Sequence, residues 1–151
     1  MKKKLSVFLL IILLLSGCSS NKPKEIIYNE EIETLYGAEI KDIEAKEIKV
    51  SDFKKLMKED DFFLIISKPS CPFFVELMGN LAQAENDMDI KEFYILNAEE
   101  FTKEEKEIVY GELGQPALPG IMVKKDGEYI YKDIGSLGIE DLISLSQEYS
   151  K

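Results

Sequence analysis

The sequence predicts an α/β fold, in which helices cover both faces of a central mixed sheet. Short, continuous apolar runs alternate with segments whose apolar residues recur at helical spacing, a pattern typical of parallel strands joined by helices. Near the C-terminus, Asp126-Gly127 separates two strand-like segments. This pair predicts a hairpin, and therefore an antiparallel edge on the same sheet.

Five strands are expected. The apolar runs at 62–66 and 93–96 suit strands that are buried on both faces, and the two segments around Asp126-Gly127 form the hairpin. The expected strands span residues 47–50, 61–67, 90–97, 121–125 and 129–133.

Four helices are expected between and after these strands. Ser51 is suited to cap the first helix, and Pro72 lies where the first turn of a helix tolerates proline. Thr102 and Glu105 have capping-box spacing, and Gly138 leads into the last helix. The expected helices span residues 52–58, 72–86, 102–113 and 139–149, so the order is β-α-β-α-β-α-β-β-α.

The N-terminus has the features of an export signal. Three lysines precede an apolar run from Val7 to Leu15, which is too short to span a bilayer, and the segment Leu15–Cys18 follows directly. That segment resembles the bacterial lipobox. The resemblance implies a diacylglycerol and palmitate-type acyl chains on Cys18, cleavage just before it, and anchoring at the extracytoplasmic face of the cell membrane. The alternative is a plain signal peptide with an incidental cysteine.

We expect the chain to divide into three parts. These are a signal peptide at 1–17, a lipid-anchored stalk rich in Lys, Glu and Asn at 18–45, and one domain at 46–151. Part of the stalk, from Ile26 to Ile40, carries spaced apolar residues that suit either a short helix or a strand against the domain.

The charge balance excludes some partners. The chain has 29 acidic and 19 basic residues, for a net charge of −10, and removing the signal takes away three more lysines. Such acidity argues against binding nucleic acid or anionic lipid directly, so the lipid on Cys18 is the expected membrane contact. The chain has no histidine and only two cysteines, so we expect no metal and no cofactor.

Two local motifs, read with the element order, resemble thioredoxin. The first is the segment Ser67–Phe74 (SKPSCPFF), which follows a buried strand and opens a helix where thioredoxins carry Cys-Gly-Pro-Cys. The second begins at Leu118-Pro119 and runs through Asp126-Gly127 to Gly135 without a gap relative to the thioredoxin pattern. The resemblance implies a thioredoxin-like fold over the domain and a cis-proline at Pro119, with Pro116 as its rival.

Within that superfamily, the segment Lys68–Phe73 is most similar to the Cys-Pro-Tyr-Cys segment of the bacteriocin-transport accessory proteins of Gram-positive bacteria. The departures from the thioredoxin pattern are equally clear. Phe74 replaces the second cysteine, Ser70 replaces the usual aromatic residue, and the strand before them lacks the buried acid that many thioredoxins carry.

Cys71 is therefore the candidate nucleophile. It is expected just before a helix N-terminus, where the helix dipole and the neighbouring Lys68 favour a thiolate. The resemblance implies that Pro119 places backbone groups beside Cys71, where the family binds an extended protein or peptide substrate.

Two functions are compatible with these residues. The first is monothiol thiol–disulfide exchange, in which Cys71 acts without a resolving cysteine. The second is a redox-inactive binding or accessory module that keeps the fold and holds a partner near Cys71 and Pro119. Whether the protein is an enzyme is left open, and Cys71 as a small buried hydrophobe is a third alternative.

Overall fold

The structure, a computed structural model, describes residues 39–151. The expected signal peptide, the lipidation at Cys18 and the stalk up to residue 38 lie outside these described residues. No helix within residues 39–151 is long and apolar enough to span a membrane.

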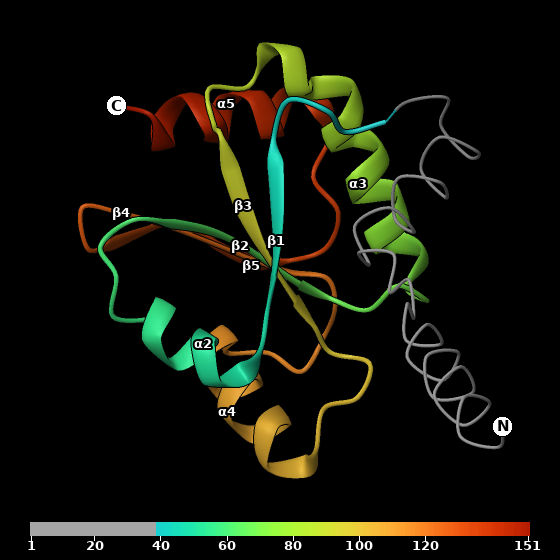
Figure 1. The fold of residues 1–151 in the computed structure, drawn as a ribbon, viewed down its shortest axis with the longest axis vertical. Coiled ribbons are helices and arrows are strands. Elements are labelled where there is room, and N and C mark those ends of the chain that lie inside the picture. Colours follow the sequence, from blue (N-terminus) through green and yellow to red (C-terminus); the bar gives the residue numbers. More distant parts are fainter. Residues whose placement is uncertain (1–38) are drawn as a thin grey trace, which may run out of the picture.

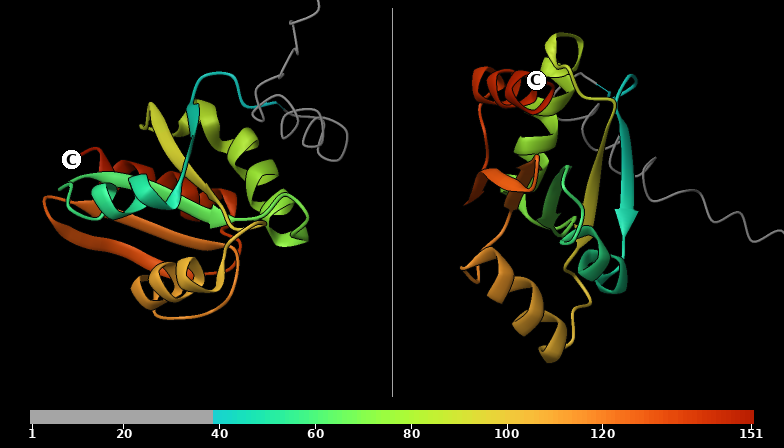
Figure 2. Two further views of the ribbon diagram at one scale, coloured as in Figure 1. Left: turned by 60° about the horizontal axis from the view of Figure 1, so that its bottom comes forward. Right: turned by 90° about the vertical axis from the view of Figure 1, so that its left-hand side faces the viewer.

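Five strands form one mixed sheet in the order β1-β3-β2-β4-β5. β1 and β2 pair with β3 in parallel, and β4 is antiparallel to both β2 and β5. Figure 2 shows the β4–β5 hairpin (orange) at one margin of the sheet and β1 (cyan) at the other. The strands are β1 (Glu44–Ile48), β2 (Phe62–Ser67), β3 (Glu92–Asn97), β4 (Gly120–Lys125) and β5 (Glu128–Ile134).

Two helices cover each face of this sheet (Figure 1). α3 and α5 lie over one face, and α2 and α4 lie over the other. The helices are α2 (Val50–Leu56), α3 (Pro72–Ala84), α4 (Lys103–Leu113) and α5 (Ile139–Tyr149), and a 3₁₀ turn η2 (Glu85–Asp87) follows α3. The predicted α/β class and the predicted element order are confirmed.

β2 is the central strand and connects the two halves of the core. All six of its residues are buried, as expected of a strand between two helical layers. Phe63 and Ile65 pack with α3 and α5, whereas the alternate residues Phe62, Leu64 and Ile66 pack with α2 and α4. The end of β2 is thereby held in a fixed position relative to both layers.

The first strand begins earlier than the sequence predicts. β1 spans Glu44–Ile48 rather than residues 47–50, and Ile40 and Ile43 before it are buried in the core beside α3. The physical reason is a distant carboxylate. Glu85, at the end of α3, accepts hydrogen bonds from the backbone N–H groups of Lys41 and Asp42, at 2.8 and 3.1 Å.

The predicted N-terminal cap is present in α4 and absent from α2. Thr102 and Glu105 form the predicted capping box of α4, with both reciprocal hydrogen bonds present. Ser51, in contrast, is not the cap of α2, because the helix begins at Val50 and Lys49 occupies the cap position without a side-chain hydrogen bond.

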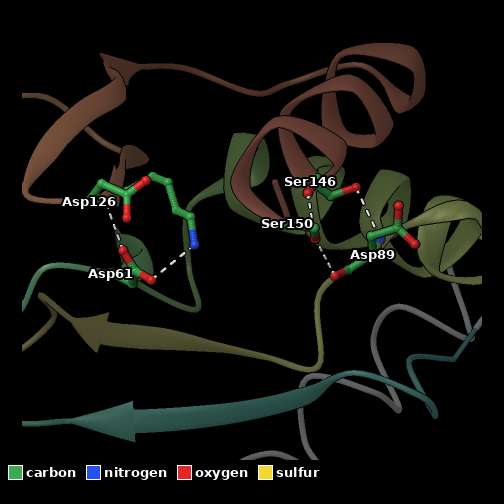
Figure 3. Close-up of polar contacts among 6 residues, drawn as sticks. Asp61, Asp89, Asp126, Ser146 and Ser150 are labelled. Carbon is green, nitrogen blue, oxygen red and sulfur yellow. Dashed lines mark hydrogen bonds and ion pairs between the residues drawn. The ribbon is translucent and has the colours of Figure 1, made fainter.

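Two sets of polar contacts join segments that are distant in sequence (Figure 3). Asp61 accepts hydrogen bonds from the Asp126 N–H at 2.7 Å and from the Lys125 ammonium at 3.0 Å, which attaches the β4–β5 hairpin to the loop before β2. In the loop before β3, the Asp89 N–H donates a hydrogen bond to the Ser146 hydroxyl on α5 at 3.2 Å.

Candidate functional site

Cys71 lies where the chain leaves β2 and enters α3. α3 lies over one face of the sheet. α4, which follows the neighbouring strand β3, lies over the other face. In open α/β sheets, the carboxyl ends of two neighbouring strands whose connections diverge in this way are the usual position of ligand sites. Cys71 occupies the N-cap of α3 at this edge.

A tight turn holds the Cys71 backbone. Its N–H donates to the carbonyl of Lys68 at 3.0 Å, and its own carbonyl accepts the N–H groups of Phe74 and Val75 at 3.0 and 3.2 Å. Pro72 follows in the first turn, where the absence of an N–H costs no helical hydrogen bond. The Cys71 side chain makes no capping hydrogen bond, so its sulfur is not committed to the helix.

The segment around Pro119 comes to the same place from the other half of the chain. The Leu118–Pro119 peptide bond is cis, and no other cis bond occurs in the described chain, so Pro116 does not fill that role. The Cys71 sulfur lies 3.9 Å from the Leu118 carbonyl oxygen. The Pro119 carbonyl accepts the N–H of Gly135 at 2.8 Å, which connects this segment to the end of β5.

Access to the sulfur is restricted. Cys71 is 8% exposed and belongs to the core cluster beneath α3. Phe74, where a second cysteine would stand, is 1% exposed within the same cluster. Phe73, two positions after the cysteine, is by contrast 59% exposed, a feature that the sequence analysis did not single out.

The supporting chemistry around Cys71 is sparse. The strand before it presents Ile65, fully buried, and no acid. The Lys68 side chain is exposed and makes no ion pair with another residue of the range 39–151. The Ser67 hydroxyl, at the end of β2, is buried without a hydrogen-bond partner in the part of the chain that the structure describes.

Gly120 has a different role from the one expected. The sequence suggests that it permits close approach of another backbone next to Pro119. The structure instead places the end of a side chain there: a Cβ on Gly120 would stand 2.5 Å from a methyl carbon of Leu113. The glycine therefore lets the end of α4 pack against the start of β4.

Two acidic residues lie in the turn between β3 and α4. Glu99 and Glu100 are both exposed there, and the sequence analysis did not single them out. There they line a cavity of about 310 Å³ together with Phe101. The only sequence signal for this arrangement is an aromatic residue next to two glutamates at the end of a buried strand.

The described residues form no metal-binding site. Among residues 39–151, no three Cys, Asp or Glu side chains gather in a way that could hold a metal ion. Cys71 is the free cysteine of this range, and Cys18 lies outside it.

Comparisons with known proteins support the fold. No protein-family model matches the chain, and a search of the curated proteins finds no significant match. Solved structures do match. Thioredoxin f from spinach chloroplast, in its short form, aligns with a TM-score of 0.54 and 14% identity, covering 74% of this chain and 99% of that one.

Two further thioredoxins align similarly. The Malassezia sympodialis thioredoxin gives a TM-score of 0.53 at 17% identity, over 74% of this chain and 96% of its own. The Aeropyrum pernix thioredoxin gives 0.50 at 17% identity, over 67% and 83%. At these identities the likeness is one of fold: the chain has a thioredoxin-like fold, with one cysteine at the point where β2 meets α3.

Proposed function

We propose that this protein is a thioredoxin-fold protein that carries out monothiol thiol–disulfide exchange through Cys71. One observation carries the proposal: Cys71 occupies the N-cap position of α3, and its sulfur lies 3.9 Å from the carbonyl oxygen of Leu118, which precedes the cis-proline. A helix N-terminus favours a thiolate, which is the nucleophile in disulfide exchange.

The exchange has two steps. The Cys71 thiolate attacks one sulfur of a partner disulfide, which forms a mixed disulfide and releases the other partner sulfur as a thiolate. An external thiol, from a second protein or a small molecule, then attacks the mixed disulfide and returns Cys71 to the thiolate. The external thiol supplies the electrons in this cycle, because Phe74 cannot resolve the mixed disulfide.

A specific observation favours a second function, a binding or accessory module without redox chemistry. Cys71 is 8% exposed, Phe74 three positions later is buried in the core, and the strand before Cys71 has no buried acid. In this case the segment around Pro119 would hold a partner polypeptide. The resemblance of the Lys68–Phe73 segment to accessory proteins of bacteriocin transport is compatible with this function and with exchange.

In either case we propose that lipid on Cys18 holds the protein at the extracytoplasmic face of the cell membrane. The support is the lipobox-like segment after the apolar run. A lipid-anchored thiol protein would meet exported partners as they fold or pass the membrane.

The deciding measurement is the reaction of Cys71 with an aromatic disulfide that releases a coloured thiolate. The Cys18→Ala chain serves for this purpose, because Cys71 is then its one cysteine. For an exchange protein, we expect the folded chain at pH 7 to react at least as fast as the same chain unfolded in guanidinium. A folded chain that reacts much more slowly would contradict exchange and favour the binding module.

A genetic measurement separates the two functions in the cell. If Cys71 exchanges disulfides, a Cys71→Ser variant that folds normally should have no function in the cell. It should leave function intact if the protein is a binding module.

A further inference from the structure

A cleft opens at the carboxyl ends of β1 and β3, next to the edge where Cys71 lies. Its cavity of about 310 Å³ lies within the size range of small ligand sites. Its apolar lining comes from the end of β1, the start of α2, the end of β3 and the following turn: Ile48, Val50, Leu96 and Phe101.

Carboxylates surround this apolar lining. Glu47, Glu99, Glu100 and Glu105 line the cleft, against one lysine, Lys49. Glu105 is committed to the capping box of α4. Glu99 and Glu100 are exposed, and their carboxylates pair with no cation among residues 39–151.

Apolar walls with acidic groups above them suit one kind of side chain. Lysine and arginine carry an aliphatic stem that packs on apolar surface and a cationic end that remains near charge and water. The ring of Phe101 can also attract a cation placed over its face. The net charge of −10 steers basic partners toward the protein and disfavours a second acidic copy in the cleft.

The cleft and the thiol share one edge of the sheet. The N–H of Ala98, directly before Glu99, donates to the carbonyl of Ser67 at 2.7 Å, so the acidic turn starts alongside the end of β2. The apolar lining of the cleft belongs to the α2/α4 side of the sheet, whereas Cys71 packs on the α3/α5 side, so the two places lie at the same edge but in different layers.

We propose that this cleft binds a lysine or arginine side chain of an extended partner polypeptide. The inference rests on the proposed function for the partner being a polypeptide. It adds the chemistry of that partner, which is a basic segment.

The test uses the full-length chain with Cys71→Ser in non-ionic detergent, so that no covalent bond contributes to binding. The probe is a fluorescein-labelled peptide, Ser-Lys-Val-Lys-Val-Lys-Ser, titrated by anisotropy at 150 mM salt. The comparison peptide has glutamine in place of each lysine. We expect the lysine peptide to bind and the glutamine peptide to bind at least about tenfold more weakly.

A matched pair of variants separates the cleft from overall charge. Glu99→Gln with Glu100→Gln should weaken binding of the lysine peptide about tenfold, because two exposed ion pairs are lost. Glu140→Gln with Glu148→Gln, on exposed positions of α5, removes the same charge far from the cleft and should leave binding nearly unchanged.

The proposal would be overturned if both double variants weakened binding of the lysine peptide equally. It would also be overturned if the lysine and glutamine peptides bound the unmodified cleft equally well. A dimer of the chain that dissociates when Glu99 and Glu100 are neutralised would overturn it too, since a second copy would then occupy the cleft. The disulfide-probe rate of Cys71, measured separately, reports on the exchange function alone. If the lysine peptide binds but Cys71 does not react with the disulfide probe, the exchange function is refuted and the binding of a basic partner is still supported.

Discussion

At the residue scale, the chemistry of Cys71 depends on what occupies the position three residues later. Positions i and i+3 at the start of a helix lie on the same side, so the Phe74 ring stands where a resolving sulfur would stand. The ring is buried in the core cluster beneath α3. The chain therefore uses this position for packing rather than for redox chemistry.

We expect Phe74→Cys to form an intrachain disulfide with Cys71 under mild oxidation. In the reduced form it should lower the free energy of unfolding by about 2–4 kcal/mol, because a buried ring is replaced by a small side chain. Free-thiol titration and urea unfolding measure the two effects, with Cys18→Ala as the background.

Phe73→Cys is the matched control for this change. Phe73 is exposed and lies two positions from Cys71, on a different side of the helix. This variant should keep both thiols free and lose little stability. Disulfide formation in Phe73→Cys but not in Phe74→Cys would contradict the geometry described for α3.

Glu85 is a second residue whose role depends on distant partners. Its carboxylate is buried at 8% exposure and accepts the N–H groups of Lys41 and Asp42, more than 40 positions earlier. Lys41 and Asp42 are exposed residues, so each of these hydrogen bonds to a charged acceptor contributes its net value, about 1 kcal/mol, rather than a full desolvation cost. Glu85 thus attaches the segment before β1 to the end of α3.

We expect Glu85→Ala to destabilise the fold by about 1–3 kcal/mol, because two backbone donors lose their acceptor. Hydrogen exchange at the amides of Lys41 and Asp42 should accelerate more than exchange in β2. Asp87→Ala, an exposed acid in the same 3₁₀ turn, is the control and should leave both amides protected. Unchanged exchange in Glu85→Ala would refute the attachment.

At the element scale, the β4–β5 hairpin depends on a loop from another part of the chain. The Asp126 N–H and the Lys125 ammonium hold the pKa of Asp61 below its ordinary value. Because the pKa is lower in the folded state, the charged form of Asp61 stabilises the fold. That contribution is present above the unfolded pKa of about 3.9 and is lost as the pH falls through the lower folded pKa.

We therefore expect Asp61→Asn to reduce the loss of stability between pH 5 and pH 2, relative to the unmodified chain. Urea unfolding at a series of pH values measures this difference. Asp60→Asn changes the neighbouring carboxylate while the Asp61 contacts remain, and should show the original pH dependence. An identical pH profile for Asp61→Asn and the unmodified chain would exclude a stabilising role for these contacts.

At the scale of the whole molecule, the sheet order brings the site together. Cys71 and Leu118 are 47 positions apart, yet β2 and β4 are neighbouring antiparallel strands, so the end of one meets the start of the other. The cleft at the ends of β1 and β3 places carboxylates at the same edge of the sheet as Cys71 and Leu118.

The attachment of the whole chain to the membrane is predicted from Cys18. Cells grown with labelled palmitate should label the unmodified protein, and Cys18→Ala should lose the label because the lipobox-like segment then has no cysteine to carry the diacylglycerol. Cys71→Ser is the control and should stay labelled. Label retained in Cys18→Ala would show that the lipobox interpretation is wrong.

The sequence by itself determined the class of fold, the order of its elements and the position of Cys71 before a helix. These features follow from local periods and caps, such as the apolar run of β2 and the Thr102–Glu105 capping box. Such signals act between residues a few positions apart, so they can be read along the chain.

Only the tertiary structure decided how much of the Cys71 sulfur is accessible, which proline lies beside it, and how the segment before β1 is held. The burial of Cys71 depends on α3 packing over the sheet, and the position of Lys41 depends on Glu85. The acidic cleft likewise needs two strands and two helices to converge. These properties arise from contacts between distant segments, and no local pattern in the sequence encodes such contacts.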